Sequence, residues 1–227
     1  VQVISSGGMA NNTTLLAGTQ SVSSGGSALS TVISYGGAQH VSAGGIAQNT
    51  SVCSSGHMIV LSDGLARQTE IYGSGRQDVY AGGVASHTVL SGYFIEYYDD
   101  YYDYDNTSDY FAEQNVFGGI AIDTTINAVA SQRIVSGSAI STIINGGDQE
   151  IYNGYADSTI LNRGRQSVGS SSIVEHTTMY GGYQGIWGNG IASSTIISGG
   201  HQGVGVDGSA FSTMIYSGSQ TIDSGGQ

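Results

Sequence analysis

Hydrophobic and polar positions along this chain recur with a period of about 18 residues. One unit, residues 20–37, reads QSVSSGGSALSTVISYGG, and the next restarts at Gln39. If the last residue of each Gly-rich turn is the marker, neighbouring markers lie 17 to 19 residues apart, except for one interval of 36. The markers are Gly8, Gly26, Gly45, Gly64, Gly83, Gly119, Gly137, Gly154, Ser171, Gly190, Gly208 and Gly226. A repeat of this kind determines the fold class before any short motif is considered.

Each unit carries the same residue types at the same offsets from the marker. Ala stands two residues after it in ten of eleven units and Thr five residues after it in ten of eleven; Ile173 and His176 are the exceptions. An aliphatic residue stands seven after the marker in most units, and a Gln followed two residues later by Val or Ile precedes most turns. Short Val-, Ile- and Thr-rich tracts between Gly turns are typical of strands.

The pattern predicts an all-β chain: a right-handed parallel β-helix, or β-solenoid, of about 12 coils with one Tyr- and Asp-rich insertion. Stacked at the strand spacing of about 4.8 Å, such coils form a rod on the order of 55 Å long. We expect buried Ala, Thr, Gln and aliphatic ladders, with His176 filling a Thr position, and glycines that supply positive φ at the corners. The variable position six residues after the marker is expected to face outward.

The repeat fails between the coils of residues 1–92 and those of residues 114–227. Residues 93–113 hold seven of the 15 Tyr and seven of the 17 acidic residues. We interpret them as a loop leaving one corner of a single continuous domain; a degenerate coil is the alternative. Tyrosines favour contact loops, although a merely solvated acidic segment is an equal alternative. The binding-loop candidates are Tyr97, Tyr98, Tyr101, Tyr102, Tyr104 and Tyr110.

Charge and composition exclude several classes of function. The formal net charge is −12, with five Arg and no Lys, so nucleic-acid binding is not expected because phosphates would lack counter-charges. No apolar run approaches the roughly 18 residues of a membrane span, so we expect no membrane insertion by this segment. Since no signal peptide opens the chain and the repeat stops within a unit, we interpret the sequence as a fragment of a longer repeat protein. Cys53 has no partner for an internal disulfide.

Catalytic and metal sites are not expected. Asp148 and Glu150 lie two residues apart on one side of a predicted strand, which leaves a polysaccharide-degrading β-helix enzyme as a less favoured alternative. The five His share no adjacent column, so no metal stripe is predicted, and no cofactor motif is found.

The unit Gln-x-Val-x-Ser-Gly-Gly-x-Ala-x-x-Thr-x-Ile-x-x-Gly, as in residues 20–36 and 202–218, resembles the repeat of the AIDA-type self-associating autotransporter adhesins, TibA-like proteins included. The resemblance covers the chain except residues 93–113. It implies a β-helical passenger displayed on the surface of a Gram-negative bacterium, anchored through the outer membrane or released. It also implies roles in bacterial autoaggregation, biofilm formation and host-cell adhesion as a virulence factor.

The resemblance further implies O-heptosylation of Ser or Thr by a dedicated bacterial heptosyltransferase. The candidate acceptors are corner serines expected to face outward: Ser24, Ser34, Ser62, Ser91, Ser136, Ser198 and Ser217. Ser also favours turns for purely conformational reasons. The functional hypothesis is homotypic association between cells, and contact with a host-cell surface, through the solenoid face. The alternative is a receptor- or glycan-binding adhesin that acts through residues 93–113.

Overall fold

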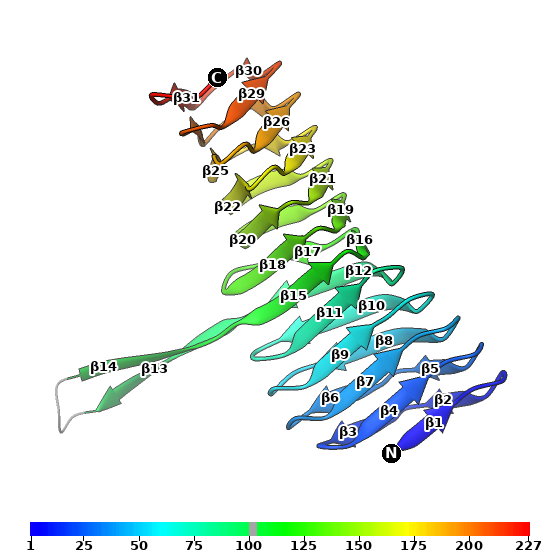
Figure 1. Cartoon of the computed structure of the whole chain (residues 1–227). Coiled ribbons are helices and arrows are strands. Elements are labelled where there is room, and N and C mark those ends of the chain that lie inside the picture. Colours follow the sequence, from blue (N-terminus) through cyan, green and yellow to red (C-terminus); the bar gives the residue numbers. More distant parts are fainter. Residues whose placement is uncertain (100–103) are drawn as a thin grey trace.

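The computed structural model of the chain is a right-handed parallel β-helix of about 11 turns. It describes residues 1–99 and 104–227, with side chains for residues 1–93 and 111–227. The coils stack along one axis with the two termini at opposite ends (Figure 1). A single sheet of 29 strands winds around this axis, and the described residues contain no helix. The predicted fold class is therefore confirmed.

Each coil has three faces, which we name after the residue that each buries. The Gln face is formed by β1 (Gln2–Ile4), β4 (Thr19–Val22), β7 (Ala38–Val41), β9 (His57–Val60), β11 (Arg76–Tyr80), β15 (Ala112–Phe117), β18 (Ala130–Val135), β25 (Tyr183–Ile186), β28 (His201–Val204) and β31 (Ser219–Ile222). The Ala face is formed by β2 (Met9–Asn11), β5 (Ser27–Leu29), β16 (Ile120–Ile122), β19 (Ser138–Ile140), β21 (Tyr155–Asp157), β23 (Ile173–Glu175), β26 (Ile191–Ser193) and β29 (Ser209–Phe211). The Ile face is formed by β3 (Thr14–Leu16), β6 (Val32–Ser34), β17 (Thr125–Ile126), β24 (Thr178–Met179), β27 (Ile196–Ile197) and β30 (Met214–Ile215).

Five longer strands continue across a corner without a break. Three run from the Ala face into the Ile face and two from the Ile face into the Gln face. They are β8 (Ile46–Val52), β10 (Leu65–Tyr72), β12 (Val84–Ser91), β20 (Ile143–Tyr152) and β22 (Ile160–Gly169). Neighbouring coils pair in parallel with like residues in register, for example Gln20 with Gln39 and Ala28 with Ala47.

The interior is built from the predicted ladders. The Ala, Val and Ile columns are almost fully buried in all but the terminal coils. Between them lies a polar ladder, in which Gln149 donates from Nε2 to Oε1 of Gln132 (2.8 Å) and to Oγ1 of Thr142 (3.1 Å). Gln166 repeats the first contact to Gln149 at 2.8 Å. Buried amides that are satisfied in this way add stability and fix the register between coils.

The last glycine of each turn is required for a reason other than the positive φ that the sequence suggested. Gly64 does not have a positive φ, but a Cβ on it would lie 2.2 Å from the carbonyl oxygen of Val41 in the preceding coil. The preceding residue in several turns, such as Gly44 (φ 77°), is the one that takes positive φ. The marker column is therefore conserved in the repeat because the coil backbones approach closely.

The corner between the Ala and Ile faces contains no glycine in any coil. In each of eleven coils a single residue takes φ between 52° and 59°, and we call this position the αL corner. These residues are Asn12, Ser30, Asn49, Gln68, His87, Asp123, Ser141, Ser158, His176, Ser194 and Ser212. The expectation that glycine supplies the corner conformations is wrong here, because one αL residue suffices and Asn, Asp and Ser tolerate it.

One coil is aligned one residue later than its sequence suggested. Ile173 pairs with Tyr155 and Ile191, so Ser172, and not Ser171, occupies the marker column. Thr177 then fills the Thr ladder and is fully buried, whereas His176 stands at the αL corner. The interpretation of His176 as a filled Thr position is wrong. Ser172 is accommodated because its hydroxyl donates to the carbonyl of Ile151 at 2.8 Å.

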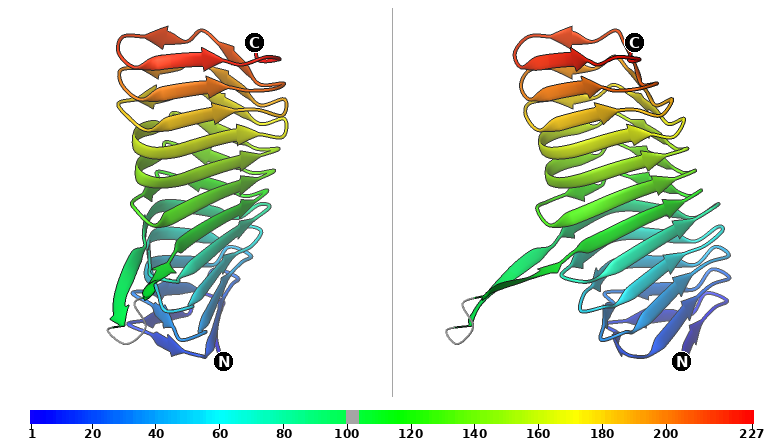
Figure 2. Two further views of the ribbon diagram at one scale, coloured as in Figure 1. Left: turned by 90° about the vertical axis from the view of Figure 1, so that its left-hand side faces the viewer. Right: turned by 60° about the vertical axis from the view of Figure 1, so that its left-hand side comes forward.

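The segment that interrupts the repeat is an antiparallel hairpin. It emerges from the corner between the Ile and Gln faces. Strands β13 (Tyr93–Asp99) and β14 (Tyr104–Tyr110) pair only with each other, in a separate two-stranded sheet. The hairpin projects away from the stacked coils in Figure 1 and in the right view of Figure 2. The solenoid resumes at Ala112, two residues earlier than the repeat indicated, and β12 pairs directly with β16 and β17 across the insertion.

Candidate functional site: a groove along the Ile face

A groove runs along the outside of the solenoid where the αL corner meets the Ile face. The reason is the alternation of side chains: the αL residue and the second residue after it both point outward, while the Thr between them points inward. The groove therefore has one wall of corner residues and one wall of Ile-face residues. Seven successive coils contribute to it, which corresponds to about 30 Å at the usual strand spacing.

The lining changes character along this length. The larger section encloses about 600 Å³ over five coils and pairs polar corner residues with β-branched residues. It is lined by His87, Val89, Asp123, Thr125, Ser141, Ile143, Ser158, Ile160, His176 and Thr178. The adjoining section shares His87 and Val89 and continues over Asn49, Ser51, Gln68 and Glu70. The prediction that the position six residues after the marker faces outward is confirmed for this wall, with the shifted coil contributing Thr178 in place of Thr177.

The apolar wall is only partly exposed. Val89, Ile143 and Ile160 are each 36–38% exposed. A binding partner could cover the remaining exposed surface of this wall. Val32 and Ile196 continue the same row beyond the section with similar exposure. A row of half-exposed β-branched residues bordered by hydroxyls is a surface suited to protein contact.

Two histidines stand at the ends of the larger section, each beside an aspartate. His87 Nε2 lies 3.5 Å from Asp123 Oδ2. His176 Nδ1 lies 2.7 Å from Asp157 Oδ1, and this hydrogen bond raises the pKa of His176 above its ordinary value. The raised pKa keeps this ion pair formed further toward neutral pH than an isolated histidine would allow.

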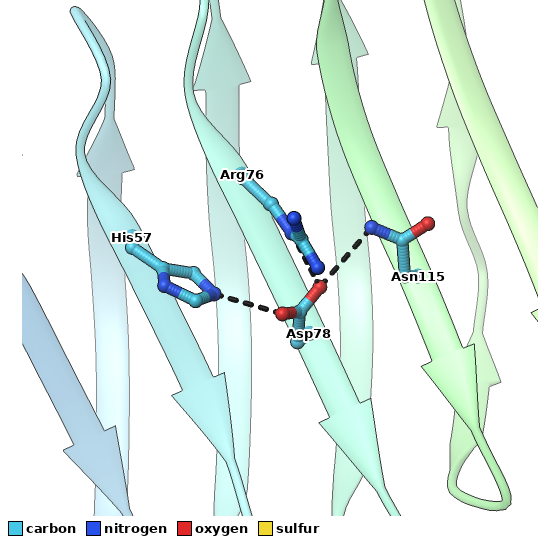
Figure 3. A network of polar contacts seen from close by, with 4 residues as sticks. All are labelled: His57, Arg76, Asp78 and Asn115. Carbon is cyan, nitrogen blue, oxygen red and sulfur yellow. Dashed lines mark hydrogen bonds and ion pairs between the residues drawn. The ribbon is translucent and has the colours of Figure 1, made fainter.

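A buried carboxylate connects three successive coils next to the insertion. Asp78 on β11 accepts hydrogen bonds from His57 on β9 (2.9 Å), from Arg76 (2.8 Å) and from Asn115 on β15 (3.1 Å), as Figure 3 shows. Burial alone would raise the pKa of Asp78, but these bonds together lower it. The ionised form therefore contributes stability above the ordinary pKa of Asp, and this contribution is lost as the pH falls through the lowered pKa. Because Asn115 follows the insertion, the cluster joins the coils on either side of it.

The two acids considered for catalysis each have an arginine on a neighbouring coil. Asp148 lies in register with Arg165, and Glu150 Oε2 is 3.9 Å from Arg133 Nε. Burial raises the pKa of Asp148, and Arg165 counteracts this. These are cross-coil charge contacts on the Gln face, outside the groove. Among the described residues, no group of three or more His, Cys, Asp or Glu is placed to hold a metal ion.

The candidate acceptor serines differ in accessibility. Ser24, Ser62, Ser136 and Ser217 are exposed, whereas Ser91 and Ser198 are half-buried. Ser34, the last residue of the Ile-face strand β6, is only 5% exposed, so its expected outward position is wrong. Sequence reasoning missed the αL corner serines, such as Ser141 and Ser158, which line the groove.

The Tyr candidates are placed only in part. The hairpin strands contain Tyr97, Tyr98, Tyr104 and Tyr110. The other two candidates, Tyr101 and Tyr102, lie outside the described residues. No helix in the described part of the chain has the length and apolar character needed to cross a bilayer.

The comparison with solved structures finds a crystal structure described as the TibC-catalysed hyper-glycosylated fragment 55–350 of TibA. It matches 99% of this chain and 92% of that chain, with 32% sequence identity and a TM-score of 0.53. No protein-family model and no curated protein matches the chain.

Proposed function

Because the chain belongs to the AIDA-type autotransporter adhesins, the family of TibA, we propose that it mediates bacterial autoaggregation, biofilm formation and host-cell adhesion. In this proposal it is displayed on the outer surface of a Gram-negative cell, and copies on neighbouring cells associate along their solenoids. The observation that carries the proposal is the groove with its half-exposed β-branched wall. Weak contacts repeated along a rod add through multivalency.

Charge determines how this association depends on salt. Two copies with a formal charge of −12 each repel at long range. Salt screens this repulsion, with a Debye length of about 8 Å at physiological ionic strength. Apolar contact in the groove is little affected, so clumping strengthens with salt over the physiological range.

The test places like charges in the groove of surface-displayed protein. Ile143→Glu combined with Ile160→Glu is expected to reduce the sedimentation rate of a cell suspension at least several-fold, because each carboxylate would be desolvated on contact. The matched control is Ile120→Glu combined with Ile173→Glu, which adds the same charge at residues of similar exposure on the Ala face. Equal loss of clumping in both pairs, at equal surface display, would overturn the assignment of the groove.

The projecting hairpin supports a second candidate function, contact with a host receptor or glycan. A third variant, tested both for clumping and for binding to host cells, separates receptor contact from self-association. Replacement of residues 93–111 by one glycine restores the length of the equivalent corner between Tyr72 and Arg76, since Ala112 and Glu113 pair within the solenoid. Loss of host-cell binding with unchanged clumping assigns receptor contact to the hairpin. Unchanged binding to host cells removes this candidate function.

We also propose that a dedicated heptosyltransferase modifies the exposed corner serines. Support comes from the TibA fragment, which is described as hyper-glycosylated, and from the exposure of Ser24, Ser62, Ser136 and Ser217. Intact mass of the protein from its native host, compared with protein from a host without such an enzyme, is expected to differ by whole heptose units. Peptide mapping should find them at exposed serines and not at Ser34; identical masses would remove the glycan from the mechanism.

A further inference from the structure

Two aromatic rings lie over glycines of adjacent strands on the outer surface of the Gln face, away from the groove. Tyr183 begins β25 and Trp187 follows its last residue, with Gly185 between them. A Cβ built on Gly185 would lie 2.8 Å from Cε1 of Tyr183 and 2.9 Å from Cζ3 of Trp187. Both rings therefore lie close over this glycine.

The platform extends over the two neighbouring coils. A Cβ on Gly169 would lie 2.8 Å from Nε1 of Trp187, and one on Gly203 would lie 2.5 Å from the hydroxyl oxygen of Tyr183. Glycine within a strand often marks a place where another group approaches the backbone closely. Here the rings lie against the backbones of three coils; Tyr183 is 39% exposed and Trp187 is half-buried.

Polar groups border this aromatic surface. The guanidinium of the exposed Arg165 lies over the Trp187 ring, 5.8 Å from its centre. The His201 ring stacks beside Tyr183 with centroids 5.6 Å apart, and its Nδ1 lies 2.8 Å from the hydroxyl of Ser219. Asp148 stands in register with Arg165, so the charges at this edge are balanced.

We propose that Trp187 and Tyr183 form a binding platform for neutral oligosaccharides. A pyranose ring has an apolar C–H face that packs on aromatic rings, while its equatorial hydroxyls remain free for polar partners at the edge, here Arg165 and His201. The balanced charge around Arg165 favours a neutral over an acidic sugar. The platform lies on a different face from the groove and is independent of self-association.

Trp187 is the one tryptophan of the chain, so its fluorescence reports this site alone. Titration with cellohexaose, chitohexaose and lactose is expected to shift or quench the emission for at least one sugar, with saturation. Tyr183→Ala keeps the reporter and is expected to weaken binding at least fivefold. The control Tyr35→Ala removes a tyrosine that is 72% exposed at a corner and should leave the affinity unchanged.

A purely structural role for the rings, as covers for the glycine backbone, makes a different prediction. In that case none of the sugars changes the emission of the wild-type protein, and Tyr183→Ala lowers only thermal stability; this result would overturn the proposal. Calorimetry of Trp187→Ala and Trp187→Phe provides a second readout, in which phenylalanine should retain part of the affinity. Tenfold tighter binding of a hexasaccharide than of its disaccharide indicates a polysaccharide chain, and equal affinity indicates terminal sugars of glycoproteins.

Discussion

Gly64→Ala is expected to destabilise the solenoid by about 3 kcal/mol or more, a large cost for one methyl group. The added Cβ would lie 2.2 Å from the oxygen and 2.6 Å from the carbon of the Val41 carbonyl. That carbonyl cannot move freely, because it accepts the backbone hydrogen bond of Leu61 at 2.8 Å. The substitution therefore forces apart two coils that are held by a continuous ladder.

Urea unfolding followed by circular dichroism measures this cost. The matched control is Gly18→Ala, because a Cβ on Gly18 meets no atom closer than 4.0 Å and its φ is not positive. This variant should lie within about 0.5 kcal/mol of the wild type. A similar cost for both variants would show that loss of glycine flexibility, and not the close approach of coils, governs the marker column.

The buried columns of the solenoid could be predicted from the sequence. The Ala, Thr, Gln and aliphatic columns specify what is buried, because a solenoid places equivalent residues of successive coils directly above one another. The columns could not reveal the αL corner, since Asn, Ser, His and Asp there share only a backbone conformation. The shift from Ser171 to Ser172 was hidden for a related reason: a serine hydroxyl bonded to the Ile151 carbonyl substitutes for the expected glycine.

The candidate site was less predictable than the fold. The outward column was found, but the groove also requires the αL residue two positions earlier, and the turn geometry that creates it leaves no residue signature. The aromatic platform was missed because Tyr183 and Trp187 belong to different columns of one coil, and only the glycines of neighbouring coils let both rings lie on the backbone. The pairing of β13 with β14 was hidden because the segment carries none of the repeat's columns.

Gln132→Leu is expected to destabilise the protein by about 3 kcal/mol, because it interrupts the polar ladder at a fully buried position. Gln149 Nε2 loses the amide oxygen that is one of its two acceptors, and Gln114 loses the donor that lies 2.7 Å from its Oε1. Buried polar groups in a shared network cost most when one partner alone is removed.

The chain contains its own reference for this experiment at Met58, which stands in the same column between Gln39 and Gln77. There Gln77 Nε2 donates to Thr69 Oγ1 at 3.3 Å, but in place of an amide oxygen in the preceding coil it meets the thioether sulfur of Met58 at 3.3 Å, which is a weak acceptor. Met58→Gln restores an amide of similar length and is expected to stabilise the protein by about 1 kcal/mol. The ladder accounts for stability only if the two substitutions shift the urea midpoint in opposite directions. If Gln132→Leu costs no more than Gln68→Leu at the exposed corner, the aliphatic columns alone hold the coils together.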